Sequence, residues 1–235
     1  ALARLADRLV ITVSEDDASV KLAHQLVSHA TVRNRLAILN PLLTTVHQAS
    51  QSNFLVSEIE KKLGLSVKWR LRLAKDFWQR DDTRHVKMQS LTIARAICGN
   101  SQGIAFGGGG ARAISEIGVL SELESHRIEF DHVSGTSMGA LIAAFYAQGL
   151  TAREMSEKFR AFLPNDKGLL RYNLPFISFF RDKSVNRILR RLFGKLRIED
   201  LPKPLTVISA NLISGQEIRM RKGLVWRAVR ASMSL

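Results

Sequence analysis

The sequence predicts an α/β fold in which a mostly parallel sheet carries helices on both faces. Short β-rich runs alternate with helical segments along the second half of the chain, which is the order that crossover connections between parallel strands require. Glycine clusters stand where two of these strands pass into helices. With 235 residues, of which 46% are hydrophobic, the chain is large enough to bury a substantial core.

The first hundred residues predict a smaller α/β segment that precedes the main domain. Residues 9–13 form a β-rich run, and the capping and acidic residues at 14–17 begin a helix that reaches about residue 27. Residues 67–73 alternate apolar and basic side chains, as an edge strand with one wetted face does. The other expected elements here are a strand at 36–39 and a helix at 88–98. Since the composition then turns glycine-rich, we expect two domains, 1–100 and 101–235.

The second domain alternates strands with helices. Its clearest helical pattern is formed by Val185, Ile188, Leu189 and Leu192, whose spacing places them on one face of a helix. The opposite face of this helix carries arginines. The expected strands lie at 103–106, 130–134, 205–210 and 217–220, and the expected helices lie at 111–125, at 138–148, from about 151 and around 185–192.

Composition restricts the compartment and the partners more than the fold. The net charge of +14 favours anionic partners, although runs of basic residues most often only keep a surface solvated. Cys98 is the single cysteine, so we expect no disulfide within the chain and a cytoplasmic setting. No apolar run approaches the roughly 18 residues of a membrane span. Because the sequence begins at Ala1 without methionine, we expect both ends to be truncations that leave room for a signal or an anchor.

Residues Gly135 to Gly139 form a G-x-S-x-G motif with Ser137 at its centre. The motif stands between an expected strand and an expected helix, which is the setting of a nucleophile elbow. In such an elbow the serine occupies a sharp, strained turn, and small neighbours allow the backbone to fold tightly around it. The helix that follows directs partial positive charge at the hydroxyl and favours the negative charge that develops in acyl transfer. Ser137 is therefore the predicted nucleophile.

A second glycine cluster, Gly107 to Gly110, lies at the end of the expected strand 103–106. Backbone amides without side chains can approach an oxyanion closely, so the cluster predicts an oxyanion hole, with a tight turn that binds nothing as the alternative. A dinucleotide-binding loop is disfavoured by spacing. Its fingerprint needs a third glycine at 112 or 113, where the chain has Arg112 and Ala113.

The sequence leaves the base for Ser137 open. All six histidines precede the serine, whereas an ordinary α/β-hydrolase has the order serine, acid, histidine. His132 lies on the strand that enters the elbow and is interpreted as a packed or surface residue. A carboxylate paired directly with the serine is the alternative. The downstream candidates stand in contexts typical of surface charges or helix caps, and they are Asp166, Asp182 and Asp200.

Together, the glycine loop, the elbow and the lack of a later histidine resemble the patatin-like phospholipase family, in particular bacterial relatives of neuropathy target esterase. The resemblance is specific from about residue 104 to 147 and extends weakly through 198–202 and 230–232. It implies a three-layer α/β/α fold, a Ser–Asp dyad, hydrolysis of acyl esters in phospholipids or lysophospholipids, and no metal or other cofactor. It makes Ser137 the nucleophile. It assigns the oxyanion hole to Gly108, Gly109, Gly110, Ala111 and Arg112.

Three departures from the family pattern keep a second hypothesis open. Ala113 stands where the family usually has glycine, and Glu116 stands where it usually has histidine. The family's dyad aspartate lies in an Asp-Gly-Gly or Asp-Gly-Ala motif, and no Asp-Gly pair occurs in this sequence. In the family that motif follows a stretch like Arg230-Ala231-Ser232, so we expect the dyad aspartate beyond residue 235.

The sequence therefore leaves two hypotheses about the function. The first is a lipid-ester hydrolase that works in the cytoplasm or peripherally at an anionic membrane surface. The second is a catalytically silent patatin-like fold that binds lipid or a partner protein. Nucleic-acid binding is not expected, because no recognised nucleic-acid fold or interleaved aromatic pattern occurs.

Overall fold

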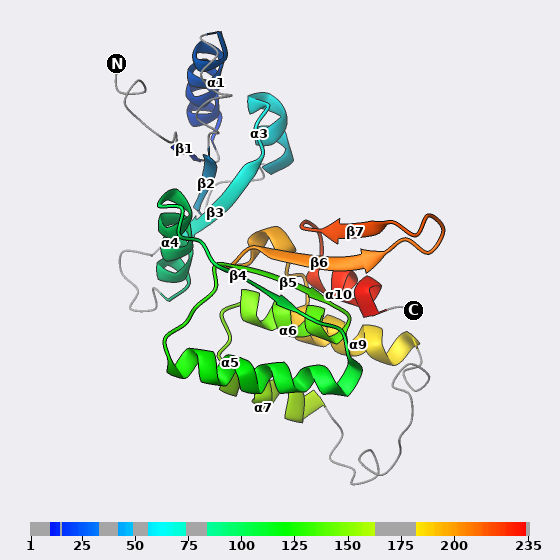
Figure 1. The fold of residues 1–235 in the computed structure, drawn as a ribbon. Helices are drawn as coiled ribbons and strands as arrows, with labels where there is room; N and C mark the ends of the chain where they lie inside the picture. Colours follow the sequence, from blue (N-terminus) through cyan, green and yellow to red (C-terminus); the bar gives the residue numbers. More distant parts are fainter. Residues whose placement is uncertain are drawn as a thin grey trace, which may run out of the picture. The chain divides into compact units, whose positions relative to one another are not determined.

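The computed structural model describes residues 10–14, 16–32, 42–48, 56–73, 84–162 and 182–233 (Figure 1). Contacts divide the chain into two units, Ala1–Asn100 and Ser101–Leu235. Each unit builds its own sheet around its own hydrophobic core. Within the described residues, no helix is long and apolar enough to cross a bilayer.

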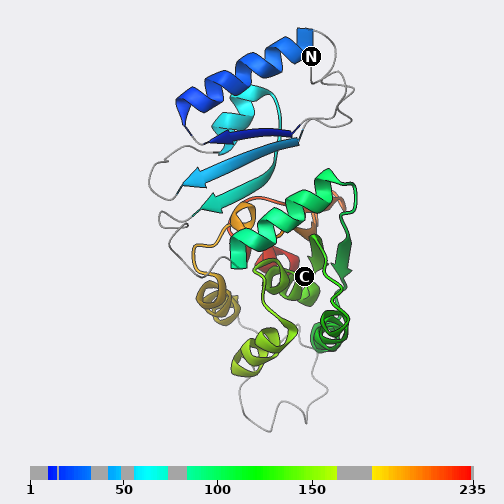
Figure 2. The same cartoon turned by 90° about the vertical axis from the view of Figure 1, so that its left-hand side faces the viewer.

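The first unit is a three-stranded parallel sheet with the order β1-β2-β3. Helices α1 and α3 cover one face of this sheet (Figure 2). The core between them includes Val13 from β1, Val20 from α1 and Ile59 from α3. The elements are β1 (Val10–Ser14), α1 (Asp17–Val32), β2 (Leu42–Gln48), α3 (Val56–Leu63), β3 (Val67–Leu73) and α4 (Arg84–Ile97).

The expected strands at 9–13 and 67–73 are confirmed, and β3 is an edge strand of the described sheet. The first helix continues to Val32, beyond the expected end near residue 27. The expected strand at 36–39 lies outside the described residues. Strand β2 and helix α3 were not predicted, although the β-branched residues Thr44, Thr45 and Val46 carried a signal for the strand.

The second unit is a four-stranded sheet with the order β4-β5-β6-β7. Strands β4, β5 and β6 are parallel and β7 is antiparallel to β6, so the predicted α/β fold with a mostly parallel sheet is confirmed. The elements are β4 (Gly103–Phe106), the 3₁₀ turn η3 (Gly110–Ile114), α5 (Ser115–Ser125), β5 (His132–Thr136), α6 (Met138–Ala147), α7 (Ala152–Phe162), α9 (Asp182–Phe193), the 3₁₀ turn η4 (Ile198–Asp200), β6 (Leu205–Ala210), β7 (Glu217–Met220) and α10 (Val225–Met233).

Strand β5 begins two residues later than expected, because side chains take up the backbone groups of Phe130. The Phe130 N–H donates to the Tyr146 hydroxyl at 3.0 Å, and its carbonyl accepts from the Lys203 ammonium at 2.7 Å. Burial raises the pKa of Tyr146, against the hydrogen bond from Phe130. The next residue, Asp131, is fully buried and accepts the Gln102 N–H at 3.0 Å. These contacts hold the chain where it enters the sheet.

Helix α6 is the centre of the second unit. All ten of its residues are buried, and it packs against β4, β5 and β6 (Figure 1). A helix that is apolar on every side belongs in a core, which agrees with the uninterrupted run of small, aliphatic and aromatic residues in α6. Helix α10 packs against α6, α9 and the strands β5 and β6. It was not predicted, although Val225, Ala228 and Val229 repeat with helical spacing and are buried.

The strand register fixes what lies at the carboxyl edge of this sheet. Phe106 of β4 pairs with Gly135 of β5, and Thr136 of β5 pairs with Ile208 of β6. Because the three strands are parallel, the segments that follow them emerge at the same edge. These segments are the glycine loop, Ser137 and the turn between β6 and β7.

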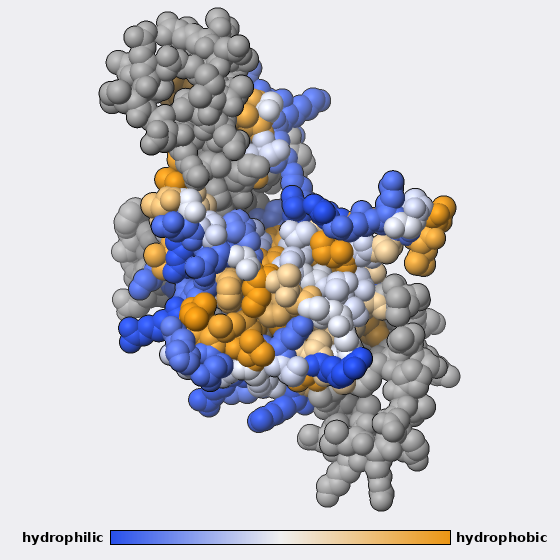
Figure 3. Space-filling view, in the orientation of Figure 1, coloured by the Kyte–Doolittle hydropathy of each residue, from blue (hydrophilic) through white to orange (hydrophobic). Residues whose placement is uncertain are grey.

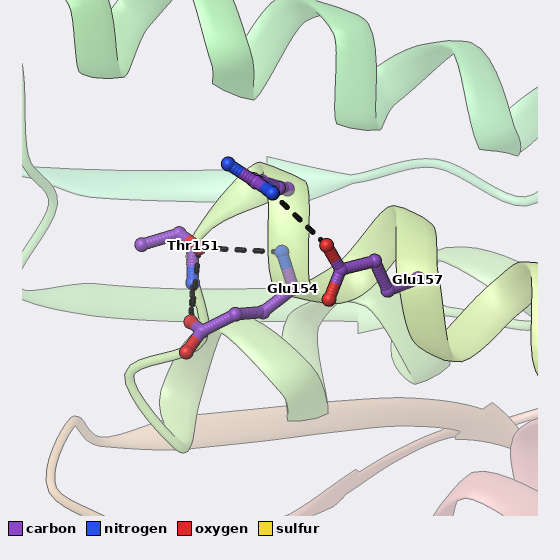
Figure 4. Close-up of polar contacts among 4 residues, drawn as sticks. Thr151, Glu154 and Glu157 are labelled. Carbon is purple, nitrogen blue, oxygen red and sulfur yellow. Dashed lines mark hydrogen bonds and ion pairs between the residues drawn. The ribbon is translucent and has the colours of Figure 1, made fainter.

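Helix α7 starts at a capping box (Figure 4). The Thr151 N–H donates to the Glu154 carboxylate at 2.7 Å, and the Thr151 hydroxyl accepts the Glu154 N–H at 3.3 Å. Glu124 of α5 accepts the next free amide, that of Ala152, at 3.0 Å. These contacts therefore bind three amides at the helix start, and they join α7 to α5.

We expect Thr151→Ala to lower the free energy of unfolding by about 1 kcal/mol, because it removes the side-chain acceptor at this helix start. Glu157→Ala is the matched control on the same helix. Glu157 forms an exposed ion pair with Arg153 at 3.2 Å, and its loss should cost about 0.5 kcal/mol or less. Urea unfolding measures both values. Equal losses in the two variants would contradict the capping role.

Candidate active site

Ser137 occupies the single residue between β5 and α6, with φ 53° and ψ −124°. Among the described non-glycine residues, Arg127 is the one other with a positive φ. Such a backbone conformation costs about 1–3 kcal/mol and persists where surrounding contacts hold it. The strand-to-helix setting predicted for the serine is therefore present, and its backbone is strained.

The two glycines of the motif are required by close backbone contacts. A Cβ added to Gly135 would lie 2.6 Å from the carbonyl carbon of Gly139, which belongs to the first turn of α6. A Cβ added to Gly139 would lie 2.5 Å from the carbonyl oxygen of Phe106, at the end of β4. Real Cβ atoms do not approach other atoms so closely. The first turn of α6 thus packs directly on the backbone of β5 and β4.

The glycine loop lies against Ser137. A Cβ added to Gly108 would meet the Ser137 Cβ at 3.3 Å and the Thr136 carbonyl oxygen at 3.7 Å. Two residues further on, the chain turns into η3, and the Arg112 N–H donates to the Gly109 carbonyl at 3.2 Å. The structure therefore brings the predicted loop and Ser137 into contact, while the Ala111 and Arg112 side chains are exposed.

A serine from the end of the described chain fixes the backbone of Ser137. The Ser137 N–H donates to the Ser232 hydroxyl oxygen at 2.8 Å, and the Ser232 hydroxyl donates to the Ile208 carbonyl of β6. Ser232 thus connects α10, β6 and the elbow. No sequence pattern indicates this role of Ser232, because 95 residues separate the two serines.

Glu116 binds the start of the glycine loop. Its Oε1 accepts the Gly107 N–H at 2.9 Å, and its Oε2 is buried without a hydrogen-bond partner. Burial raises the pKa of Glu116, while the hydrogen bond from Gly107 acts in the opposite direction. A carboxyl group from the first turn of α5 therefore lies next to the loop.

The other candidate acids and bases lie elsewhere. His132 and Asp200 lie near the starts of strands, because His132 is the first residue of β5 and Asp200 ends η4, five residues before β6. Five strand residues span about 16 Å, so both lie towards the opposite edge from Ser137. Asp182 is the first residue of α9, and Asp166 lies outside the described residues. The part of the chain that the structure describes holds no cluster of His, Cys, Asp or Glu suited to a metal ion.

A model of the patatin-like phospholipase family matches residues 104–235, which include the glycine loop, the elbow and Ser232. The chain belongs to this family. Membership is consistent with the expected three-layer α/β/α arrangement. It also makes the chain part of a family of lipid hydrolases.

Curated relatives of this patatin-like chain belong to the NTE group. An uncharacterized NTE family protein of Mycobacterium tuberculosis is 37% identical over 143 residues, which are 61% of this chain and 24% of the relative. The lysophospholipase NTE1 of Phaeosphaeria nodorum is 32% identical over 196 residues, covering 77% of this chain and 13% of the relative. The lysophospholipase nte1 of Emericella nidulans is 31% identical over 191 residues, which cover 74% of this chain and 12% of the relative. The chain thus spans a quarter or less of the length of these relatives.

We expect Gly139→Ala to lower the free energy of unfolding by about 3 kcal/mol, because its Cβ would overlap the backbone of β4. Gly118→Ala is the matched control. Gly118 lies in α5, where an added Cβ meets no atom within 4 Å, so this variant should gain about 0.5–1 kcal/mol. Chemical denaturation measures both. Tolerance of Gly139→Ala would show that α6 does not pack on β4 in this way.

We expect Glu116→Gln to raise the melting temperature more at neutral than at acidic pH. Because the pKa of Glu116 is raised on folding, its contribution to stability is present at low pH and is lost as pH rises through the folded pKa. Glutamine keeps an acceptor for the Gly107 N–H and does not titrate. Thermal melts across this range test the effect, with Glu58→Gln in α3 as an exposed control. A gain that does not depend on pH would contradict the buried carboxylate.

Proposed function

We propose that this chain carries the nucleophile and oxyanion hole of a serine hydrolase that cleaves acyl esters of phospholipids or lysophospholipids. The observation that supports this most is the strained backbone of Ser137, held between β5 and α6 against the backbone of Gly108. Strain at a hydroxyl residue, beside a glycine loop and a helix start, is typical of a nucleophile elbow. The lysophospholipase names of the NTE1 relatives support the substrate class.

In the proposed reaction the Ser137 oxygen attacks the ester carbonyl carbon. The carbonyl π electrons move onto the oxygen, which becomes the oxyanion of a tetrahedral intermediate. The base takes the Ser137 hydroxyl proton during the attack and passes it to the leaving oxygen when the intermediate collapses, so the alcohol part of the lipid departs and the acyl group stays on Ser137. Water then attacks the acyl-enzyme, releases the fatty acid and restores the serine.

Backbone amides of the glycine loop are the proposed donors to the oxyanion. The Gly107 N–H already donates to Glu116, so it is not available for this role. The Arg112 N–H likewise donates to the Gly109 carbonyl. We therefore assign the role to the amides from Gly108 to Ala111, together with the partial positive charge at the start of α6. Preorganised donors of this kind typically contribute several kcal/mol to acyl transfer.

The proposed base is an aspartate that follows α10. The contact between Ser232 and Ser137 gives a physical reason for this position. Because the Ser232 hydroxyl accepts the Ser137 N–H, chain that continues past α10 starts beside the nucleophile. In the family the Asp-Gly motif comes after a stretch like Arg230-Ala231-Ser232. A carboxylate there would accept the Ser137 proton directly, without a histidine.

A catalytically silent fold that binds lipid is the second candidate function. It is favoured by one observation, the Glu116 carboxyl group at the glycine loop. If Glu116 is ionised, its negative charge opposes an oxyanion nearby. Burial raises the pKa of Glu116, so its carboxyl group stays protonated to a higher pH than an exposed carboxyl group does. Turnover that depends on Ser137 separates the two candidates.

We expect Ser137→Ala in the full-length protein to reduce hydrolysis of lysophosphatidylcholine by about a thousandfold or more, because the nucleophile is lost. Ser125→Ala, at the end of α5, is the matched control and should retain activity. Released fatty acid measures turnover, and thermal melts verify folding. Equal hydrolysis by the Ser137 variant and the unaltered protein would exclude the proposed mechanism.

A further inference from the structure

Helices α9 and α10 carry a set of arginines on neighbouring surfaces. The two helices pack against each other, and Leu189 of α9 and Val225 and Val229 of α10 are buried in the core. Helical spacing places the arginines of both helices outside this buried stripe. They are Arg187, Arg190, Arg191, Arg227 and Arg230, of which Arg230 alone is half-buried and the others are exposed. We call these five residues the arginine face.

Trp226 of α10 joins the arginines of the two helices. The guanidinium carbon of Arg190 lies 4.5 Å from the centroid of the Trp226 ring, and that of Arg227 lies 5.4 Å from it. These are cation–π contacts, and Trp226 itself packs against the hydrophobic core. An arginine in such a contact keeps N–H groups that can bind phosphate oxygens. The core therefore anchors two guanidinium groups that are suited to an anion.

Carboxylates do not balance the charge of the arginine face. Of the residues that the structure describes, no acidic one forms an ion pair with Arg187, Arg190, Arg191 or Arg227. Asp182, the first residue of α9, is the one acidic residue in the sequence of the two helices. Like charges without a carboxylate partner repel one another, and a bound anion reduces this repulsion.

Other surfaces of the second unit are more mixed. Figure 3 shows hydrophobic residues among hydrophilic ones around α5, where Val119 is 59% exposed. On α7, Arg153 forms an ion pair with Glu157 at 3.2 Å. Elsewhere in this unit, Arg197 pairs with Glu199 and Arg219 pairs with Glu217. The arginine face is therefore a distinct basic surface.

An anionic bilayer matches this surface in charge and in chemistry. Basic residues near an anionic leaflet each add to the attraction, and arginine binds phosphate oxygens in a bidentate manner. Tryptophan favours the level of the lipid head groups, because its ring is apolar and its N–H is polar. Nucleic acid offers the same phosphates, but the sequence has no recognised nucleic-acid fold.

Helix α10 connects the arginine face to the nucleophile. Near the end of this helix, the Ser232 hydroxyl accepts the Ser137 N–H at 2.8 Å. Six residues separate Trp226 from Ser232, which corresponds to about 9 Å along the helix axis. A surface that binds the arginine face therefore lies close to the elbow.

We propose that the arginine face of α9 and α10 binds the phosphate head groups of an anionic phospholipid bilayer. The choice of a lipid surface rests on the proposed function, in which phospholipids or lysophospholipids are the substrates. The guanidinium groups contact lipid phosphates, and the exposed part of the Trp226 ring lies among the head groups. Binding in this way holds Ser137 near its substrate.

The test uses the full-length protein with Arg187→Gln, Arg191→Gln and Arg227→Gln combined. These side chains are exposed, so the variant should fold, which thermal melts verify. Sedimentation with vesicles of phosphatidylcholine and phosphatidylglycerol measures binding. We expect about a tenfold or larger loss of vesicle binding, because three positive charges are removed. The unaltered protein should bind less tightly at higher salt and to vesicles of phosphatidylcholine alone.

The matched control combines Arg153→Gln, Lys158→Gln and Arg160→Gln, which remove the same charge from exposed positions of α7. This control should bind vesicles like the unaltered protein. Equal losses in the two variants would overturn the inference, since net charge alone would then explain binding. Undiminished binding by the α9–α10 variant would also overturn it, as would binding of a single-stranded DNA oligonucleotide in preference to vesicles.

Hydrolysis of p-nitrophenyl butyrate, a dissolved ester, reports on the site separately. The α9–α10 variant should hydrolyse it like the unaltered protein, because the substituted residues belong neither to the glycine loop nor to the elbow. Ser137→Ala should lose this hydrolysis and still bind vesicles. Hydrolysis that persists in Ser137→Ala would contradict the proposed function without affecting the vesicle measurement, so the two failures are distinguishable.

Discussion

The second unit depends on the contact between the first turn of α6 and the backbone at the end of β4. Gly139 permits this contact, since a Cβ there would overlap the Phe106 carbonyl. Because α6 packs so closely on the backbone of β4, its first turn lies against the glycine loop, and Ser137 adopts a positive φ. The core packing of α6 and the geometry of the candidate site therefore have the same cause.

Two hydrogen bonds to side chains then fix backbone amides of the site. Ser232 of α10 holds the Ser137 amide, and Glu116 of α5 holds the Gly107 amide. Because Ser232 binds the Ser137 amide, the Ser137 hydroxyl is not needed to hold its own backbone. The second determines which loop amides remain for an oxyanion. Glu116 affects both stability and the proposed chemistry. One oxygen of its carboxyl group positions the loop, while the other is buried without a hydrogen-bond partner, which destabilises the fold.

Short sequence patterns predicted the strands, helices and turns that depend mainly on neighbouring residues. Strand β4, helix α6 and the turn at Ser137 follow from glycine placement and apolar runs, and β6 and β7 have the expected bounds. The start of β5 was wrong by two residues, because Tyr146 and Lys203 bind the Phe130 backbone from distant positions. The role of Ser232 also had no local signal. Sequence patterns predict which residues prefer a strand or a turn, whereas contacts across the fold decide where each strand starts and which side chain holds the site.

The most direct test of the account is covalent labelling of the full-length protein with a fluorophosphonate, followed by mass spectrometry of its peptides. Such reagents phosphonylate a serine that is activated as a nucleophile. We expect one principal adduct, on Ser137, and slower labelling in Ser232→Ala, where the Ser137 amide loses its acceptor. Absence of an adduct, or an adduct on another serine with Ser137 unmodified, would contradict the assignment of Ser137 as the nucleophile.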